Sequence, residues 1–444
     1  MGHVMPFDGP DVTREELVRW QARRVVELAR RLVPGNRFWS ERFAACGVSA
    51  DRLGDAEEFR RLTPVTKADL AADHERFPPY GSNLTEPAAR RSRLHQTSGT
   101  TGKPLRWLDT PASWQWIMRC WEQLFAIMEL GRDDRLFFPF SFGPFLGFWA
   151  GFEGANRLGN LCLAGGGMSS ESRLRFLAEN RVTVVACTPT YALRLAEVAR
   201  EIGFDLAGAG VERLLVAGEA GGNVPATRAR IEREWSARIV DHWGMTEVGP
   251  LAIESPRDPG GLVLLESECV AEVVDPATMA PVADGEEGEL VITNLGRTGS
   301  PLLRYRTGDR VRARLSKVPL PVMVDGRWVR VPLRTLEGGI LGRVDEMITI
   351  RGNNLYPAAL EEVIRREPTV AEYRIELCES RGMQSLRIEV ECDPRETNPA
   401  GVLARLATEI KGRWNFQAEL VESAAGSLPR HELKGRRFFR RTAP

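Results

Sequence analysis

The stretch from residue 135 to about residue 242 constrains the fold most, because short apolar runs alternate there with helical segments. The apolar runs are RLFFPFSF, VTVVAC, ERLLVAGE and ARIVDHW, and segments such as TYALRLAEVAREIG separate them. Strands that alternate with helices predict a parallel sheet covered by helices. The expected fold class is therefore α/β.

The flanking regions predict different structures. Residues 14–70 show a helical apolar stripe. After residue 260, short strands with Pro, Gly and Asp turns predict a more antiparallel β region. Near the end, Pro357 can open a helix ending near Arg366, the runs EYRIELCE and SLRIEVEC predict an antiparallel pair, and another helix covers 400–413. We expect a large domain over residues 1–342 and a small α+β domain over residues 343–444.

Charge and apolar content exclude several classes of protein. Sixty Lys and Arg residues balance 60 Asp and Glu residues, so no net field draws the chain to nucleic acid or an anionic membrane. No apolar run approaches the ~18 residues that span a bilayer, and the N-terminus lacks a secretory apolar core. We expect a cytoplasmic protein. Its seven cysteines lie far apart in mostly apolar surroundings, which predicts buried free thiols.

One ten-residue segment, HQTSGTTGKP from His95 to Pro104, concentrates hydroxyls, glycines and a lysine. Small residues let backbone N–H groups converge on an anion, and a lysine adds a cation. The spacing differs from that of a nucleotide-binding P-loop, and Pro follows the lysine in place of Ser or Thr. An ordinary polar turn is the alternative. The candidate phosphate-binding residues are Ser98, Gly99, Thr100, Thr101, Gly102 and Lys103.

With five further motifs, this segment resembles the AMP-forming acyl-adenylating superfamily, in its phenylacetate-CoA ligase-like branch. The motifs follow the family's order and extend over nearly the whole chain: TSGTTGKP, AGEAGG, HWGMTE, GELVITNL with PLLRYRTGDRV, GRVDEMITIRGNNLYP, and LPRHELKG. The resemblance implies a fold with a large N-terminal domain and a small mobile C-terminal domain. It also implies that ATP activates a carboxylic acid as an acyl adenylate, which then reacts with CoA.

The resemblance implies roles for individual residues at the phosphates. The loop Ser98–Lys103 would hold the β- and γ-phosphates, Thr246 would contact the α-phosphate, and Glu247 would bind Mg²⁺, which prefers hard oxygen ligands. A helix cap followed by a solvated acid is the alternative for Thr246 and Glu247. Lys434 would stabilise charge between the carboxylate and the α-phosphate during adenylation. The alternative is that the basic tail around it, LKGRRFFRR, is only a solvated terminus. The family often has glycine immediately before this lysine, whereas this chain has Leu433.

Other motif residues would bind adenosine and CoA. Trp243 would stack on adenine, Asp309 would accept from the ribose hydroxyls with Arg343 nearby, and Gly218 and Glu219 would line the adenine pocket through their backbone. A core aromatic residue and a turn residue are the alternatives for Trp243 and Asp309. The resemblance further places Gly352 beside the pantetheine tunnel and makes Asp345 the hinge of the domain rotation.

The acyl pocket of the resembling family corresponds to an aromatic stretch between residues 135 and 152. Phe138, Phe140 and Phe142 alternate and would share one face of a strand, and helical spacing follows Pro144. Ordinary core packing is the alternative. We take Phe140, Phe142, Gly143 and Phe145 as pocket candidates and an aryl acid as the substrate, with a medium-chain fatty acid as the second choice.

Several points stay open in the sequence. The acceptor of the acyl group is CoA, a carrier-protein thiol or an amine. The alternative to an enzyme is a nucleotide-binding sensor that has lost catalysis. A homodimer also remains open. Relatives can carry a zinc site after the HWGMTE-like motif, but the matching stretches here lack cysteine, so we predict ATP, Mg²⁺ and CoA without zinc.

Overall fold

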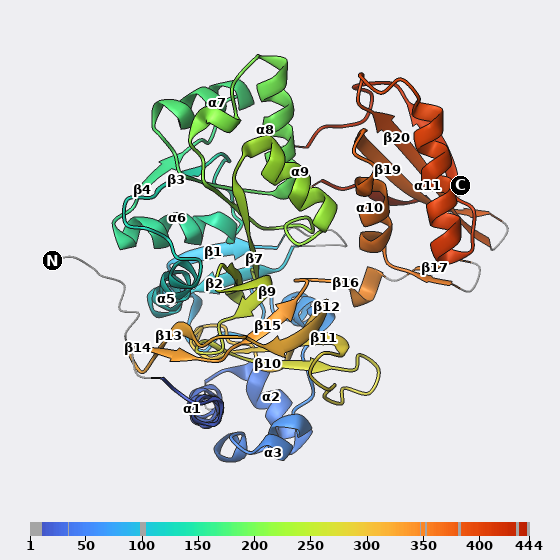
Figure 1. Cartoon of the computed structure of the whole chain (residues 1–444). Coiled ribbons are helices and arrows are strands. Elements are labelled where there is room, and N and C mark those ends of the chain that lie inside the picture. The colour runs from blue at the N-terminus through green and yellow to red at the C-terminus, as the bar shows by residue number, and fades with distance from the viewer. Residues whose placement is uncertain are drawn as a thin grey trace.

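The computed structural model describes residues 11–33, 35–97, 104–346, 348–350, 353–380, 383–431 and 435–441. Helices and strands in these ranges form two units in Figure 1. The larger runs from the N-terminal helices to the strands near residue 343. The smaller, coloured orange and red, lies beside α8 (Pro189–Glu201) and α9 (Pro225–Trp235).

The predicted parallel sheet is confirmed. Its strands lie in the order β4-β3-β5-β6-β7, and the helices α6 to α9 alternate with them along the chain. The bounds are β3 Arg135–Phe138, β4 Leu161–Ala164, β5 Val184–Cys187, β6 Arg213–Val216, β7 Arg238–Met245, α6 Gly147–Leu158 and α7 Ser170–Glu179.

Side chains that alternate along these strands bury two different cores, one on each face of the sheet. Phe138 packs in a cluster with residues of α5 (Pro111–Ile127) and α6, whereas its neighbour Phe137 packs in a second cluster with residues of α7, α8 and α9. Two covered faces leave the edges of the sheet as the places where loops can form a site.

The antiparallel region predicted after residue 260 is also confirmed, and it continues the same sheet. Beyond β7 the order is β8-β9-β15-β12-β11-β10, with β16 paired to β12. The bounds are β8 Gly249–Ser255, β9 Asp258–Leu264, β10 Cys269–Val274, β11 Glu287–Asn294, β12 Tyr305–Leu315, β15 Arg334–Glu337 and β16 Gly342–Arg343. Two separate hairpins are β1 (Arg93–Gln96) with β2 (Arg106–Asp109), and β13 (Leu320–Val324) with β14 (Arg327–Val331).

The N-terminal region is helical, as expected, and capping residues start its helices. Thr13 with Glu16 and Thr66 with Asp69 form capping boxes, in which each side chain accepts from the other residue's backbone. The buried indole of Trp39 connects this region to the rest of the large unit by donating to the carbonyl of Pro301 at 3.0 Å. The bounds are α1 Arg14–Leu32, α2 Arg37–Cys46, α3 Ala56–Arg61 and α4 Lys67–Arg76, with short 3₁₀ helices at Ala50–Arg52 and Ala88–Arg90. A further 3₁₀ helix, Ala207–Ala209, lies between α8 and β6.

The small unit contains the predicted helices and the predicted antiparallel pair, packed around a core drawn from residues after 347. Its four-stranded sheet has the order β21-β20-β19-β22. The bounds are β17 Ile348–Ile350, β18 Asn353–Leu355, α10 Pro357–Arg366, β19 Val370–Ser380, β20 Met383–Cys392, α11 Pro399–Trp414, β21 Glu419–Ser423 and β22 Phe438–Arg441.

The basic tail is not simply a solvated terminus after Lys434. Strand β22 pairs in parallel with β19, and Arg437 is buried, with two nitrogens donating to the carboxylate of Glu372. A strand edge and a buried ion pair therefore order this end of the chain, which its charge pattern alone did not indicate.

All seven cysteines are free, as predicted, and burial is confirmed for Cys120, Cys187, Cys269 and Cys392, whereas the other three are only partly buried. Within the described ranges, no helix is both long enough and apolar enough to cross a bilayer.

Candidate functional site

Three of the candidate segments follow parallel strands and lie at one edge of the sheet. β3 leads into the segment of Phe140 and Gly143, β6 leads into Gly218 and Glu219, and β7 leads into the turn of Glu247. Because these strands are parallel, their carboxyl ends lie at the same edge. In open α/β sheets, ligands bind in crevices at that edge.

The phosphate-binding candidates Ser98, Gly99, Thr100, Thr101, Gly102 and Lys103 lie outside the described residues. The residues on both sides of them are firmly paired. Thr97 N donates to the carbonyl of Leu105 at 3.0 Å, and Leu105 N donates to Oγ1 of Thr97 at 3.0 Å. Gln96 N also donates to the carbonyl of Pro144 at 2.7 Å, so the hairpin of β1 and β2 adjoins the connection after β3.

Trp243, Asp309 and Arg343 come from three motifs and meet in the structure. The indole Nε1 of Trp243 donates to Oδ2 of Asp309 at 2.9 Å, and Nη1 of Arg343 lies 3.2 Å from Oδ1. Trp243 and Asp309 are buried, and the pairing of β12 with β16 sets Asp309 opposite Arg343. A carboxylate has about four lone-pair sites in all and accepts from hydroxyl donors, the kind of group that a ribose presents.

Glu247 is buried, so the alternative of a solvated acid after a helix cap is wrong. It lies in the turn between β7 and β8, where the hydroxyl of Tyr305 donates to its Oε1 at 3.5 Å and Nζ of Lys67 lies 4.0 Å from the same oxygen. Burial, together with the Glu247 carboxylate, raises the pKa of Tyr305 well above its ordinary value. The phenol therefore stays protonated as a hydrogen-bond donor.

A buried ion pair, Arg297 with Asp109, holds the turn of Thr246 and Glu247. Nε and Nη2 of Arg297 donate to the two carboxylate oxygens at 2.7 and 2.6 Å, and both side chains are fully buried. Nη1 of the same guanidinium donates to the carbonyls of Thr246 and Glu247. Burial opposes ionisation of Asp109, but Arg297 lowers its pKa to about 2. Sequence reasoning missed this pair, since 188 residues separate its members.

Asp241 is a second residue that sequence reasoning missed, although it stands two positions before Trp243 on β7. Gly222 of the AGEAGG loop approaches it so closely that a Cβ on residue 222 would lie 2.3 Å from its Oδ1. Burial raises the pKa of Asp241 to about 7, although the Asn223 amide donates to this carboxylate and lowers it. The period-two spacing with Trp243 is the signal that could have found it.

We expect Asp241→Asn to stabilise the protein in a pH-dependent way. The folded pKa of about 7 exceeds the ordinary value of 3.8, so the neutral carboxyl contributes stability that is lost as the pH rises from about 4 to 7. At pH 4, urea unfolding should give the same free energy of unfolding for Asp241→Asn and the wild-type protein. At pH 8, the variant should have the larger free energy of unfolding, by about 1 kcal/mol or more.

Asp258→Asn is the control with the opposite sign. Burial raises the pKa of Asp258, but hydrogen bonds from Arg314 and Thr335 outweigh this effect and lower it. This variant should therefore lose stability relative to the wild-type protein as the pH rises. A gain for Asp241→Asn that is the same at pH 4 and pH 8 would contradict the raised pKa.

The side chain of Glu219 makes two hydrogen bonds that the sequence did not predict. Its Oε1 accepts from Thr190 N at 2.8 Å, and its Oε2 accepts from Gly435 N at 2.7 Å. Gly218 has φ 95°, a left-handed conformation that favours glycine. Whether either residue lines an adenine pocket stays a prediction.

The aromatic stretch is partly corrected. β3 ends at Phe138, where the chain leaves the sheet. Phe140 and Phe142 therefore follow the strand and do not share one of its faces. The rings nevertheless pack together, with centroids 5.1 Å apart for Phe140 and Phe142 and 4.7 Å apart for Phe142 and Trp149. The indole of Trp149 donates to the carbonyl of Gly143 at 3.1 Å, and Phe145 is 48% exposed.

Three other candidates are described incompletely. Lys434 and Gly352 lie outside the described residues, and Asp345 lies in a single 3₁₀ turn, η4 (Val344–Glu346), between β16 and β17. Gly435, the residue after Lys434, is described and contacts Glu219.

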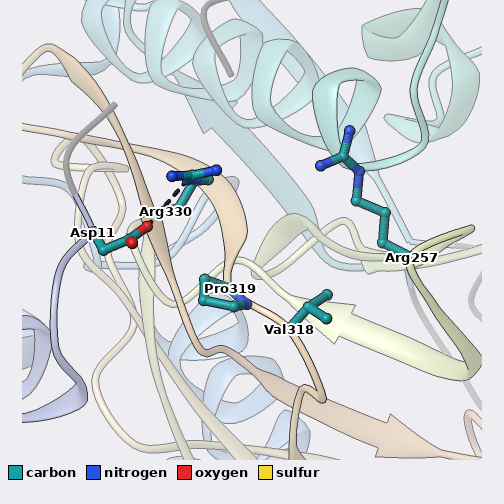
Figure 2. Close-up of a pocket in the computed structure, with 5 residues that line it drawn as sticks. All are labelled: Asp11, Arg257, Val318, Pro319 and Arg330. Atoms are coloured by element: carbon teal, nitrogen blue, oxygen red, sulfur yellow. Dashed lines mark hydrogen bonds and ion pairs between the residues drawn. The ribbon is translucent and has the colours of Figure 1, made fainter. Parts of the chain in front are cut away.

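A surface pocket elsewhere contains none of the sequence candidates. Asp11, Arg257, Val318, Pro319 and Arg330 line it, and Figure 2 shows the ion pair between Asp11 and Arg330. Among the described residues, no three His, Cys, Asp or Glu side chains gather as a metal site. The expected lack of zinc stays a prediction.

Comparisons with known proteins agree with the motifs. The family profile described as AMP-binding enzyme matches residues 64–297, and the profile described as AMP-binding enzyme C-terminal domain matches residues 352–441. Phenylacetate-coenzyme A ligase of Escherichia coli strain K12 is 27% identical over 438 residues, which cover 96% of this chain and 95% of that protein.

Two solved structures of 2-hydroxyisobutyryl-CoA ligase are similar to the whole chain. The one in the postadenylation state with 2-HIB-AMP has a TM-score of 0.86 at 25% identity, covering 97% of this chain and 90% of its own. The one with 2-HIB-AMP and CoA in the thioesterification state has a TM-score of 0.70 at 26% identity, covering 96% and 90%.

Proposed function

The chain belongs to the AMP-binding enzyme family, and on this premise we propose that it is an AMP-forming acid–CoA ligase. It activates a carboxylic acid with ATP as an acyl adenylate and then transfers the acyl group to CoA. The observation that carries the proposal is the contact of Trp243, Asp309 and Arg343 from three separate motifs, at the edge where buried Glu247 also lies.

The chemistry assigns each group a task in the first step. A carboxylate oxygen of the acid attacks the α-phosphorus, and the P–O bond to pyrophosphate breaks. The loop Ser98–Lys103 holds the β- and γ-phosphates, Thr246 contacts the α-phosphate, and Lys434 neutralises charge that develops between the two reactants. Asp309 and Arg343 bind the ribose, beside the indole of Trp243.

In the second step, a thiol attacks the carbonyl carbon of the acyl adenylate and AMP leaves. Gly352 is assigned to the side of the pantetheine tunnel. Asp345 is the proposed hinge, since η4 stands between β16, which pairs with the large sheet, and the core of the small unit. We keep 1–342 and 343–444 as the proposed domains and the cytoplasm as the proposed location.

An aromatic acid is the proposed substrate. The packed rings of Phe140, Phe142 and Trp149 at the end of β3 favour a flat aryl group, and the similar Escherichia coli protein is named for phenylacetate. A medium-chain fatty acid is the second candidate. CoA is preferred to a carrier protein or an amine because the similar proteins are named CoA ligases.

ATP–pyrophosphate exchange over a panel of aryl and alkyl acids tests this proposal. Exchange that depends on an aryl acid is expected, and a medium-chain acid that supports faster exchange would transfer the assignment to fatty acids. If no acid supports exchange while ATP still binds, the proposal fails in favour of a nucleotide sensor.

Glu247 suits Mg²⁺, which often binds proteins through one or two carboxylates while substrate phosphates complete its shell. Bound there, the ion neutralises phosphate charge. We predict that exchange requires Mg²⁺, that Glu247→Gln weakens the response to Mg²⁺ by tenfold or more, and that the purified protein contains no stoichiometric zinc.

The matched control is Glu266→Gln, another buried carboxylate of the large unit, which pairs with Arg14 and lies outside the motifs. A titration of exchange rate against Mg²⁺ together with elemental analysis checks both statements. Zinc retained in a one-to-one ratio after mild chelation would refute the argument from missing cysteines, and an unchanged Mg²⁺ titration in Glu247→Gln would refute the assigned ligand.

A further inference from the structure

The two units meet through polar contacts on α8 and α9. Arg437 Nη1 donates to Oγ1 of Thr190 at 3.1 Å, and Arg230 Nη1 donates to the carbonyl of Val370 at 2.9 Å. Two ion pairs lie further out along the same face: Arg430 with Glu197 at 3.4 Å and Arg200 with Asp393 at 3.6 Å. Such contacts can exchange for water when the units separate, unlike a large apolar interface.

Glu219 joins this interface to the lysine motif. One carboxylate oxygen accepts from Thr190 N in the first turn of α8, and the other accepts from Gly435 N, the first peptide nitrogen after Lys434. The two acceptor distances, 2.8 and 2.7 Å, are those of charge-assisted hydrogen bonds. A single side chain of the large unit therefore holds the peptide nitrogen of the residue that follows the catalytic lysine candidate.

The fit at Gly435 is too close for a larger residue. A Cβ on residue 435 would lie 2.2 Å from Nη1 of Arg437 and 3.1 Å from Oγ1 of Thr190. Arg437 is itself held by Glu372 and Thr190, so it has little room to move aside. Glycine thus lets the tail approach both Glu219 and the start of α8.

The arrangement of the two units links this contact to one step of the reaction. The same relative, 2-hydroxyisobutyryl-CoA ligase, matches this chain better in its postadenylation state than in its thioesterification state. Since sequence identity and coverage are nearly equal in the two matches, the difference reflects how the units are placed. The contact between Glu219 and Gly435 therefore exists in an arrangement similar to the postadenylation one.

We propose that Glu219 is a positioning residue that holds Gly435, the residue after Lys434, against the large unit for adenylation and releases it when the small unit turns for thioester formation. The inference rests on the proposed function. After release, Glu219 keeps its bond to Thr190 N, so the start of α8 stays capped and the freed oxygen is hydrated. The carboxylate thus favours one arrangement without locking it.

Glu219→Gln tests this role because it replaces one of the two acceptor oxygens with an NH2 group, which cannot accept from the N–H that faces it. Two half-reactions are measured separately: ATP–pyrophosphate exchange, and thioester formation from a supplied acyl adenylate and CoA. We expect the ratio of the first rate to the second to fall about tenfold or more, as for loss of a hydrogen bond to a charged group. Circular dichroism and the Kd for ATP check that the fold and the nucleotide site persist.

Two further variants make the result specific. Gly435→Ala leaves the Glu219 carboxylate in place but pushes the tail away, and it should lower the same ratio. Glu197→Gln removes a carboxylate from the same face of α8 that does not contact Gly435, and its ratio should stay within about twofold of the wild-type value.

The outcomes separate this inference from the proposed function. A wild-type protein that catalyses neither half-reaction defeats the proposed function itself. A wild-type protein active in both, with Glu219→Gln and Gly435→Ala leaving the ratio unchanged or lowering both rates equally, overturns the positioning role alone.

Discussion

Lys434→Ala should reduce ATP–pyrophosphate exchange by about 10²–10³-fold, the usual cost of removing one group that stabilises charge in the transition state. The resemblance assigns Lys434 to the adenylation step alone, and the next residue, Gly435, contacts Glu219 of the large unit. Thioester formation from a supplied acyl adenylate should therefore fall far less. Rapid-quench measurements of the two half-reactions give both rates.

Lys411→Ala is the matched control, since Lys411 is an exposed lysine on α11 of the same unit. Its two rates should equal those of the wild-type protein. Comparable losses in both half-reactions of Lys434→Ala would refute the assignment of this lysine to adenylation.

Arg297→Met should destabilise the large unit by about 3–5 kcal/mol, because it leaves the Asp109 carboxylate buried without its cation. The same guanidinium donates to the carbonyls of Thr246 and Glu247, so exchange activity should fall as well. Urea unfolding followed by tryptophan fluorescence measures the stability, because several tryptophans of this unit are buried.

Arg24→Met provides the control, since Arg24 pairs with Glu27 on the exposed side of α1 and surface pairs contribute about 0–1 kcal/mol. The double variant Arg297→Met, Asp109→Leu should recover part of the lost stability by removing the stranded charge. If Arg297→Met lowers the free energy of unfolding by less than about 1 kcal/mol, the ion pair of Arg297 with Asp109 does not stabilise the turn of Thr246 and Glu247.

The sequence predicted regular elements well where local pattern decides them. Pro357 opens α10 and Arg366 closes it, and the alternating runs before and after residue 381 form β19 and β20. In contrast, the strand expected to include Phe140 and Phe142 ends at Phe138, because alternation of apolar residues does not report hydrogen bonding to a neighbouring strand.

The site was predictable only where motifs carry it. Trp243, Asp309 and Arg343 were named from three motifs, and the structure brings them together. The long-range contacts that support the site were not predicted, for one physical reason. Asp109 with Arg297, and Glu219 with Gly435, are contacts between residues far apart in the chain, set by packing that no local spacing encodes.

The assignment of the motifs to adenylation also explains why a family name alone does not identify the acid. Residues around ATP are fixed by the chemistry of phosphate and ribose, whereas the rings of Phe140, Phe142 and Trp149 could accept many apolar acids. Exchange rates of a Phe142→Ala variant over the same panel of acids would show which acids the packed rings select.

The most direct measurement of the central claim uses an aryl acid labelled with ¹⁸O in both carboxylate oxygens. Incubated with ATP, Mg²⁺, CoA and the wild-type protein, it is analysed by mass spectrometry of the AMP and of the thioester. Attack of the carboxylate on the α-phosphorus predicts one ¹⁸O in each AMP and one in each acyl-CoA. Unlabelled AMP, or ADP in place of AMP, would contradict activation through an acyl adenylate.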